Sequence, residues 1–247
     1  MNKQAMMSEY HVWDRTTRWF HWINVFAVIG LIAVGTVILN GKALGVSGEG
    51  KVLLKTVHVY IGYVFCLNLL WRLAWAFVGT RFARWSSLLP VGAGYTRRLC
   101  EYIQGAKQGD APGYLGHNPM GRLMVTFLLL VLLTMGVTGI ILAGTDVYMP
   151  PFGAYFADWV TGADPEKLAN LVPGSKEFVD KTLYADMRSF RKPVITIHYY
   201  AFFVLLAAAV LHILAVVITE LREGNGLVSA MFTGRKVFSE KPVDMEE

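Results

Sequence analysis

Residues 193–219 read PVITIHYYAFFVLLAAAVLHILAVVIT, a run of 27 residues that has no charged side chain but contains two histidines. Such a run is long enough to cross the hydrocarbon core of a bilayer as a helix, which takes about 20 residues. The two histidines, His198 and His212, are 14 residues apart. On a helix this spacing returns to within about 40° of the same face after a rise of about 21 Å. The segment therefore predicts a membrane helix that presents two imidazoles on one stripe at two depths.

Three similar runs precede this one, and they predict membrane helices at residues 19–39, 56–80 and 123–145. Arg72 is the one charged residue inside them. Helices are expected because backbone groups in lipid must be bonded internally and the runs lack the alternating pattern of barrel strands. In the whole chain 54% of the 247 residues are hydrophobic. The predicted fold class is all-α: an integral membrane four-helix bundle, with residues 1–247 as a single domain.

The segment between the third and fourth runs, residues 146–192, is predicted to be a long loop. Pro193 suits the first turn of a helix, where the missing N–H costs nothing, so the fourth helix is expected to begin there. Loops of this length without obvious structure are usually functional or bound to a partner.

Basic residues predict the orientation. Arginine and lysine are concentrated between the second and third runs and after the fourth, which places these segments and both termini in the cytoplasm. The loop 146–192 then faces the periplasm of a bacterial inner membrane. The net charge of +5 reflects the cytoplasmic loops, and no nucleic-acid partner is expected. No cleavable signal peptide is expected, because the first apolar run is too long for one.

The two cysteines exclude some redox cofactors. Cys66 and Cys100 are far apart and form neither a C-x-x-C nor a C-x-x-C-H motif. Covalent c-type haem and an iron–sulfur cluster with the usual cysteine spacing are therefore excluded.

Four histidines lie within the predicted helices, where an imidazole is costly and normally marks a functional site. A single one can be a hydrogen-bonded packing residue, but these four match in depth. His21 and His212 share the cytoplasmic level, and His58 and His198 share the outer level. Each pair can fill both axial positions of a haem iron, which favours electron transfer over oxygen binding. The pattern predicts two haems stacked across the bilayer; four ligands split over two levels exclude a single zinc site.

The 14-residue spacing recurs on the other two ligand helices. Gly35 follows His21 by 14 residues, and Arg72 follows His58 by 14, so each faces the haem that its own helix does not ligate. Glycine lets a macrocycle approach closely, although helix–helix packing is an alternative. Buried arginine needs an anion, for which a haem propionate is the candidate. Otherwise Arg72 extends to the cytoplasmic headgroups.

Two histidines lie outside the predicted helices. His11 precedes the first helix and is expected at the membrane interface. His117 precedes the third helix and is expected either to cap it or to line a pocket on the cytoplasmic side.

Four motifs are specific in combination: RWFHWIN at 18–24, WAFVGTRFAR at 75–84, YLGHNPM at 114–120, and a tail from ELRE at 220–223 to MFTG at 231–234. Together they resemble the b-type cytochrome subunit of membrane-bound nickel–iron hydrogenases, a bacterial di-haem cytochrome b family. The resemblance covers the first, second and fourth helices and the cytoplasmic loops.

This resemblance implies two haem b groups, with one ligand from each of the first two helices and two from the fourth. The ligands carry over to His21 with His212 and to His58 with His198, and Arg18 is a further candidate for cofactor binding. The resemblance also implies a subunit that passes electrons from periplasmic hydrogenase small and large subunits to quinone, an exchangeable substrate. With no nickel site, the chain is not expected to oxidise hydrogen by itself.

The loop 146–192 departs from this family in length, and it is where the partner would dock. Its aromatic residues favour an interface, although aromatics also rest on lipid headgroups; they include Phe152, Tyr155, Phe156 and Trp159. Three alternatives remain. One is a cytochrome b that exchanges electrons with a periplasmic c-type cytochrome or reductase. Another is a transporter without haem whose histidines relay protons, although the predicted helices lack carboxylates. The third is a purely structural membrane anchor, also without haem.

Overall fold

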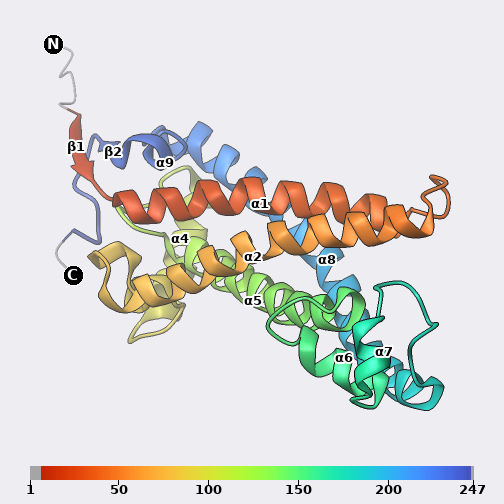
Figure 1. The fold of residues 1–247 in the computed structure, drawn as a ribbon. Helices are drawn as coiled ribbons and strands as arrows, with labels where there is room; N and C mark the ends of the chain where they lie inside the picture. The colour runs from red at the N-terminus through yellow and green to blue at the C-terminus, as the bar shows by residue number, and fades with distance from the viewer. Residues whose placement is uncertain (1–6, 246–247) are drawn as a thin grey trace, which may run out of the picture. The chain divides into compact units, whose positions relative to one another are not determined.

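Four long helices account for most of the fold. The computed structural model describes residues 7–245, and in this part of the chain four helices are long and apolar enough to cross a membrane. They are α1 (Arg15–Leu39), α2 (Gly48–Val78), α5 (Pro119–Val147) and α8 (Lys181–Glu223), labelled in Figure 1. Three of them contain a predicted run in full, and α2 contains the run 56–80 up to Val78, so the predicted all-α fold with four membrane helices is confirmed.

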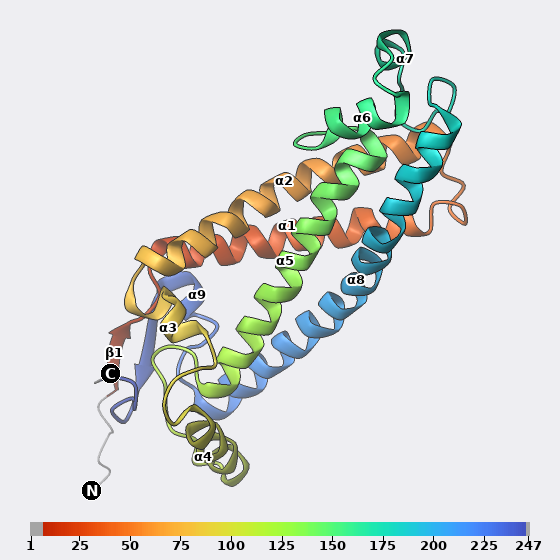
Figure 2. The ribbon, with the colours of Figure 1, turned by 90° about the horizontal axis from the view of Figure 1, so that it is seen from below.

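The remaining elements are short. Helices α3 and α4 follow α2 in the chain, and Figure 2 shows them with α9 and the strand β1. The two strands pair antiparallel with Ser8 opposite Phe238, a small addition to the all-α prediction. The bounds are β1 Ser8–His11, the 3-10 helix η1 Arg81–Ala83, α3 Trp85–Leu88, α4 Tyr95–Gln108, α6 Gly153–Thr161, α7 Pro165–Ala169, α9 Ala230–Thr233 and β2 Arg235–Phe238.

Helix α8 begins twelve residues before the predicted start. Its first turn is capped by Asp180, whose Oδ1 accepts hydrogen bonds from the backbone N–H groups of Thr182 (2.9 Å) and Leu183 (3.0 Å). The prediction that Pro193 lies in the first turn is therefore wrong, because Pro193 lies inside the helix. A proline inside a membrane helix removes one backbone hydrogen bond. Membrane helices accommodate this loss because neighbouring groups in the protein can bond the freed carbonyl. The connection between α5 and α8 is therefore shorter than the predicted loop 146–192 and comprises residues 148–180.

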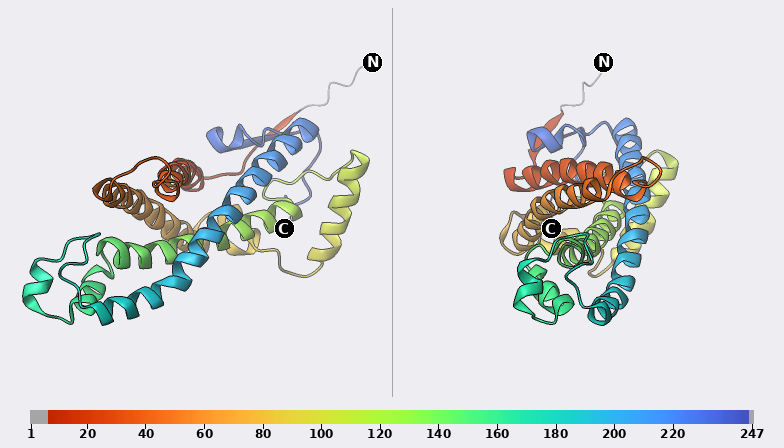
Figure 3. Two further views of the ribbon diagram at one scale, coloured as in Figure 1. Left: turned by 90° about the vertical axis from the view of Figure 1, so that its right-hand side faces the viewer. Right: turned by 45° about the vertical axis from the view of Figure 1, so that its right-hand side comes forward.

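This shortened loop carries the helices α6 and α7, drawn in green and teal in Figure 3. Phe156 and Val160 of α6 pack against Met187 at the start of α8 in a cluster of buried side chains. The loop is therefore held against α8 by a small cluster of buried apolar side chains.

Contacts divide the chain into two compact units. The first unit comprises Met1–Trp22, Leu69–Leu130 and Leu206–Glu247, and the second comprises Ile23–Asn68 and Val131–Leu205. Each long helix contributes a segment to both units, so each unit contains parts of all four membrane helices.

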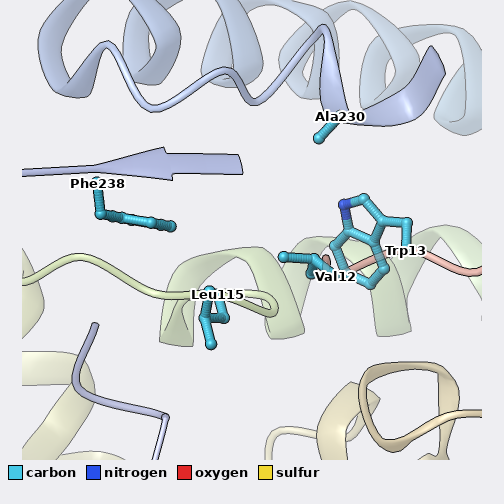
Figure 4. Close-up of a cluster of buried hydrophobic side chains, with 5 residues drawn as sticks. All are labelled: Val12, Trp13, Leu115, Ala230 and Phe238. Carbon is cyan, nitrogen blue, oxygen red and sulfur yellow. The ribbon is translucent and has the colours of Figure 1, made fainter. Parts of the chain in front are cut away.

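A buried apolar cluster joins distant segments of the first unit. Val12 and Trp13 precede α1, Leu115 precedes α5, and Ala230 and Phe238 belong to α9 and β2 (Figure 4). The backbone N–H groups of Val12 and Trp13 both donate to the Gly234 carbonyl, at 2.8 and 3.1 Å. The segment before α1 is therefore packed against the segment after α8.

Candidate cofactor sites

The second unit encloses a cavity between its helices. Residues of α1, α2, α5 and α8 line it, and most of them are apolar. His58 from α2 and His198 from α8 both line this cavity. The two histidines therefore border one space with apolar walls between four helices, the kind of site that ligands in helix bundles occupy.

The two imidazoles of this cavity have the separation expected across one metal ion. Their ring centroids are 6.4 Å apart, and the ring planes are inclined by 74°. A metal–imidazole bond of about 2 Å, plus about 1 Å from nitrogen to ring centre, gives roughly 6 Å between two rings on opposite sides of one metal. The pair therefore fits a metal bound axially from both sides.

Thr138 of α5 fixes the orientation of His198. Its hydroxyl oxygen lies 2.8 Å from His198 Nδ1 and 2.7 Å from the carbonyl oxygen of Thr134. The single hydroxyl proton is donated to that carbonyl, so the oxygen accepts from Nδ1–H. Nε2 is then the nitrogen with a free lone pair. This is the arrangement that outer partners impose on metal-binding histidines.

Two glycines leave room beside these rings. A Cβ on Gly35 would come within 3.3 Å of His58 Cε1, and a Cβ on Gly139 would come within 3.5 Å of His198 Cε1. Both glycines line the cavity. Gly35 thus lies next to the histidine pair that its own helix does not supply, the position that the 14-residue spacing predicts.

The first unit contains the other pair of histidines. His21 of α1 lies close enough to His212 of α8 for the protonated forms of the two imidazoles to repel each other. The His21 ring packs edge-on against Trp22, with centroids 5.3 Å apart. Its Nδ1 is buried and has no hydrogen-bond partner among residues 7–245. A buried, unsatisfied imidazole nitrogen is costly unless an external group uses the ring.

Arg72 lies in the first unit and is only 4% exposed. Its Nη1 donates to the Ala83 carbonyl at 3.0 Å, and the guanidinium lies 5.7 Å from the centroid of the Phe20 ring. No carboxylate of the described residues lies within ion-pair distance of it. The carboxylate of Asp14 attracts the guanidinium electrostatically without reaching ion-pair distance, so this buried charge has no directly bound anion among the described residues.

Arg18 is placed differently from the other candidates. Its Nη1 donates to the Phe232 carbonyl, and its Nε lies 3.3 Å from the position of a Cβ on Gly234. These contacts link α1 to the segment that follows α8. The predicted role of Arg18 in cofactor binding stays a prediction, and its buried Nε has no hydrogen-bond partner among residues 7–245.

His117 lies in the core of the first unit, where the sequence indicated either a cap or a pocket. Asn118, not His117, caps α5, because its Oδ1 accepts from Gly121 N–H at 2.7 Å. The His117 ring lies 4.9 Å from the Trp13 ring, and burial together with nearby Lys236 lowers the pKa of His117 to about 3. Lys236, whose Nζ donates to the Tyr114 and Gly116 carbonyls, was missed by the sequence analysis. Burial lowers the pKa of Lys236 to about 8.

The sequence analysis also missed three charged residues that line the cavity of the second unit: Lys55, Asp146 and Arg191. They lie just outside the uncharged runs from which the helices were predicted. A signal was present, since Lys55 precedes His58 by three residues and Arg191 precedes His198 by seven. Both spacings keep the charged residue on the histidine's side of its helix.

Comparisons with known proteins agree with this geometry. The family model described as prokaryotic cytochrome b561 matches residues 12–234. The "Probable Ni/Fe-hydrogenase B-type cytochrome subunit" of Rhizobium leguminosarum bv. viciae is 25% identical, covering 94% of this chain and 90% of the relative. The protein of that name from Rhodobacter capsulatus is 23% identical, covering 95% and 84%. The "Probable Ni/Fe-hydrogenase 1 B-type cytochrome subunit" of Escherichia coli K12 is 33% identical over 150 residues, covering 56% and 61%. No solved structure matches this chain.

Proposed function

Because this chain belongs to the prokaryotic cytochrome b561 family, we propose that it is the membrane electron-transfer subunit of a hydrogenase complex, with two b-type haems and quinone as its electron acceptor. The family confirms the resemblance seen in the sequence motifs and implies haem b. Haem supplies one-electron transfer when bound, and the protein sets its position, axial ligands and surroundings.

The observation that carries this proposal is the 6.4 Å separation of the His58 and His198 ring centroids within an apolar cavity. Both rings are held by helices, and the His198 tautomer is fixed by Thr138. Two axial imidazoles leave no open position on the iron, which suits electron transfer.

His21 and His212 form the second axial pair in this proposal. The buried, unsatisfied Nδ1 of His21 and the proximity of the two imidazoles support it. Arg72 then provides the positive charge for a propionate of this haem. Support for that role comes from its burial and from the absence of an ion-paired carboxylate among the described residues, since Asp14 acts on the guanidinium from beyond ion-pair distance. Gly35 has no side chain, so it allows the haem between His58 and His198 to lie close to the backbone of α1.

The spacing on α8 supports two haems at different depths, because His198 and His212 are separated by 14 residues of one continuous helix, a rise of about 21 Å. We place both termini in the cytoplasm of a bacterial inner membrane, as the distribution of basic residues indicates. The loop with α6 and α7 then faces the periplasm, near the haem of the second unit.

The names of the relatives point to a nickel–iron hydrogenase as the partner. In this proposal its periplasmic subunits deliver electrons to the haem of the second unit, and quinone accepts them from the chain. A c-type cytochrome or another reductase is the alternative partner, and no feature of the described residues favours it.

Purification in mild detergent tests this function. We expect two haem b groups per chain, a low-spin spectrum typical of bis-histidine ligation, and hydrogenase subunits that co-purify and reduce quinone with hydrogen. A preparation without haem would refute the proposal. Haem-containing protein that co-purifies with a c-type cytochrome instead would assign the alternative partner.

The docking surface for the partner is expected on exposed residues of the α6–α7 segment, which is the whole connection between α5 and α8, residues 148–180. Phe156 is buried in the core of this segment, whereas Tyr155 is 64% exposed and Val172 is 57% exposed. Tyr155→Glu and Val172→Glu place charges on this surface. The Tyr155 ring also packs edge-on against Phe156 and Trp159, so Val172→Glu is the variant that leaves these ring contacts in place. We expect association with the partner to weaken by about tenfold or more, since interface centres are depleted of charge.

Val243→Glu is a matched control for these variants, because Val243 is 53% exposed and belongs to the first unit. Haem content should be unchanged in all three proteins. Normal co-purification of both α6–α7 variants, measured against Val243→Glu, would show that this segment rests on lipid headgroups instead.

A further inference from the structure

We propose that Lys55, Asp146 and Arg191 form the site that binds the propionate carboxylates of the haem in the second unit. The inference rests on the proposed function, because it requires a haem between His58 and His198. It assigns a role to three charged residues that the sequence analysis did not identify.

The three side chains form one ion-pair network. Asp146 Oδ2 accepts from Lys55 Nζ at 2.7 Å and from Arg191 Nη2 at 2.8 Å, and Asp146 Oδ1 accepts from Arg191 Nε. The side chains of Arg191 and Asp146 are 10% and 12% exposed, whereas that of Lys55 is 35% exposed. The network ties α2, α5 and α8 together, and all three residues line the cavity.

The network lies on the helix faces that carry the axial ligands. Lys55 is one turn from His58, about 4.5 Å along α2, and Arg191 is two turns from His198, about 10 Å along α8. In both helices the charged residue lies on the N-terminal side of the histidine. Asp146 follows Gly139, which lies beside the His198 ring, by two turns of α5. The charges thus gather toward one end of the cavity, beyond the imidazoles.

The charges of this network do not balance. Among the described residues that line the cavity, the charged side chains are these two cations and one carboxylate, a surplus of one positive charge. A surplus charge beside apolar walls is costly unless an anion accompanies it. Haem provides two carboxylates at one edge of an otherwise apolar macrocycle, which matches charges at one end of an apolar cavity.

Donors for such carboxylates remain free. Arg191 uses Nε and Nη2 on Asp146, and its Nη1 has no acceptor among residues 7–245. Lys55 uses one of its three ammonium hydrogens on Asp146. Asp146 therefore holds both cations in place while each keeps a donor for a propionate oxygen.

A network that only fastened helices would also show these ion pairs, so the test must respond to charge. Redox titration of the haem-containing protein, followed at the haem α-band, provides that readout. A nearby positive charge favours the reduced haem, whose iron carries one positive charge less. Lys55→Gln should therefore lower the potential of the haem in the second unit, and Asp146→Asn should raise it.

We expect each single variant to change the redox equilibrium by roughly three- to tenfold, where tenfold equals about 59 mV for one electron. The double variant restores the network's original net charge, so its potential should return close to that of the unmodified protein. Lys51→Gln is the matched control, because Lys51 is one turn before Lys55 and does not line the cavity. Lys51→Gln should leave the potentials of both haems unchanged. In every one of these variants the potential of the haem in the first unit should also stay unchanged.

Two results would overturn the inference. One is unchanged potentials in Lys55→Gln and Asp146→Asn, with lower thermal stability as the sole effect. The other is a shift of the same sign in both variants. If Asp146→Asn does not assemble, Lys55→Gln decides the matter, because Lys55 is the most exposed member. Haem absent from the unmodified protein would instead refute the proposed function.

Discussion

Replacing His58 with alanine should remove the haem of the second unit and leave that of the first unit largely in place. Loss of one axial imidazole leaves His198 as a single ligand in an apolar cavity, which is insufficient to retain the group through purification. His198→Ala should give the same loss. Haem content and the reduced-minus-oxidised spectrum measure this, with about half of the haem remaining in each variant.

The same substitution at the other two histidines tests how the four ligands are paired. His21→Ala and His212→Ala should both remove the other spectral component. His11→Ala is the control, because His11 is exposed on β1 and should leave both components intact. Loss of the same component in the His58 and His21 variants would disprove the pairing of ligands.

Replacing Arg72 with glutamine should lower the potential of the haem in the first unit by about 59 mV or more, which is a tenfold change in a one-electron equilibrium. The guanidinium is 4% exposed, so solvent screens its charge weakly. No carboxylate of the described residues forms an ion pair with it, and Asp14 acts on it from a greater distance. Removing it favours the oxidised haem, which carries one more positive charge. Redox titration should show one potential falling and the other nearly fixed.

Arg72→Lys and Arg97→Gln complete this experiment. The lysine variant keeps the charge and should retain most of the potential. Arg97 belongs to the first unit and its side chain is 79% exposed, so its replacement should have no effect. Arg72→Gln can also be combined with each histidine variant. If its potential shift is absent in the His58→Ala protein but present in the His21→Ala protein, Arg72 acts on the haem of the second unit.

The four membrane helices could be predicted from the sequence because lipid imposes one requirement, internal bonding of every backbone group along about 20 apolar residues. Their ends could not. Helix α8 extends to Lys181, since capping by Asp180 and packing of Met187 against Phe156 and Val160 stabilise a charged first segment. Pro193, predicted to start the helix, is accommodated inside it.

The sequence by itself determined the candidate ligands, because an imidazole is costly in lipid and four of them at matched depths indicate bound metal. The spacing of 14 residues also placed Gly35 beside His58 without coordinates. These inferences rest on regular helix geometry, in which distance along the chain fixes both height and face.

The tertiary structure decided what surrounds those ligands. Thr138, Lys55, Asp146 and Arg191 come from three helices. Spacing along the chain places Lys55 and Arg191 on the histidine faces of their helices, but it does not indicate that both meet Asp146. Likewise, the sequence left Arg72 either buried or extended to headgroups, and its 4% exposure is a property of packing. Contacts between helices depend on rotation and crossing, which the apolar pattern of lipid-facing helices leaves unspecified because lipid and protein neighbours are equally apolar.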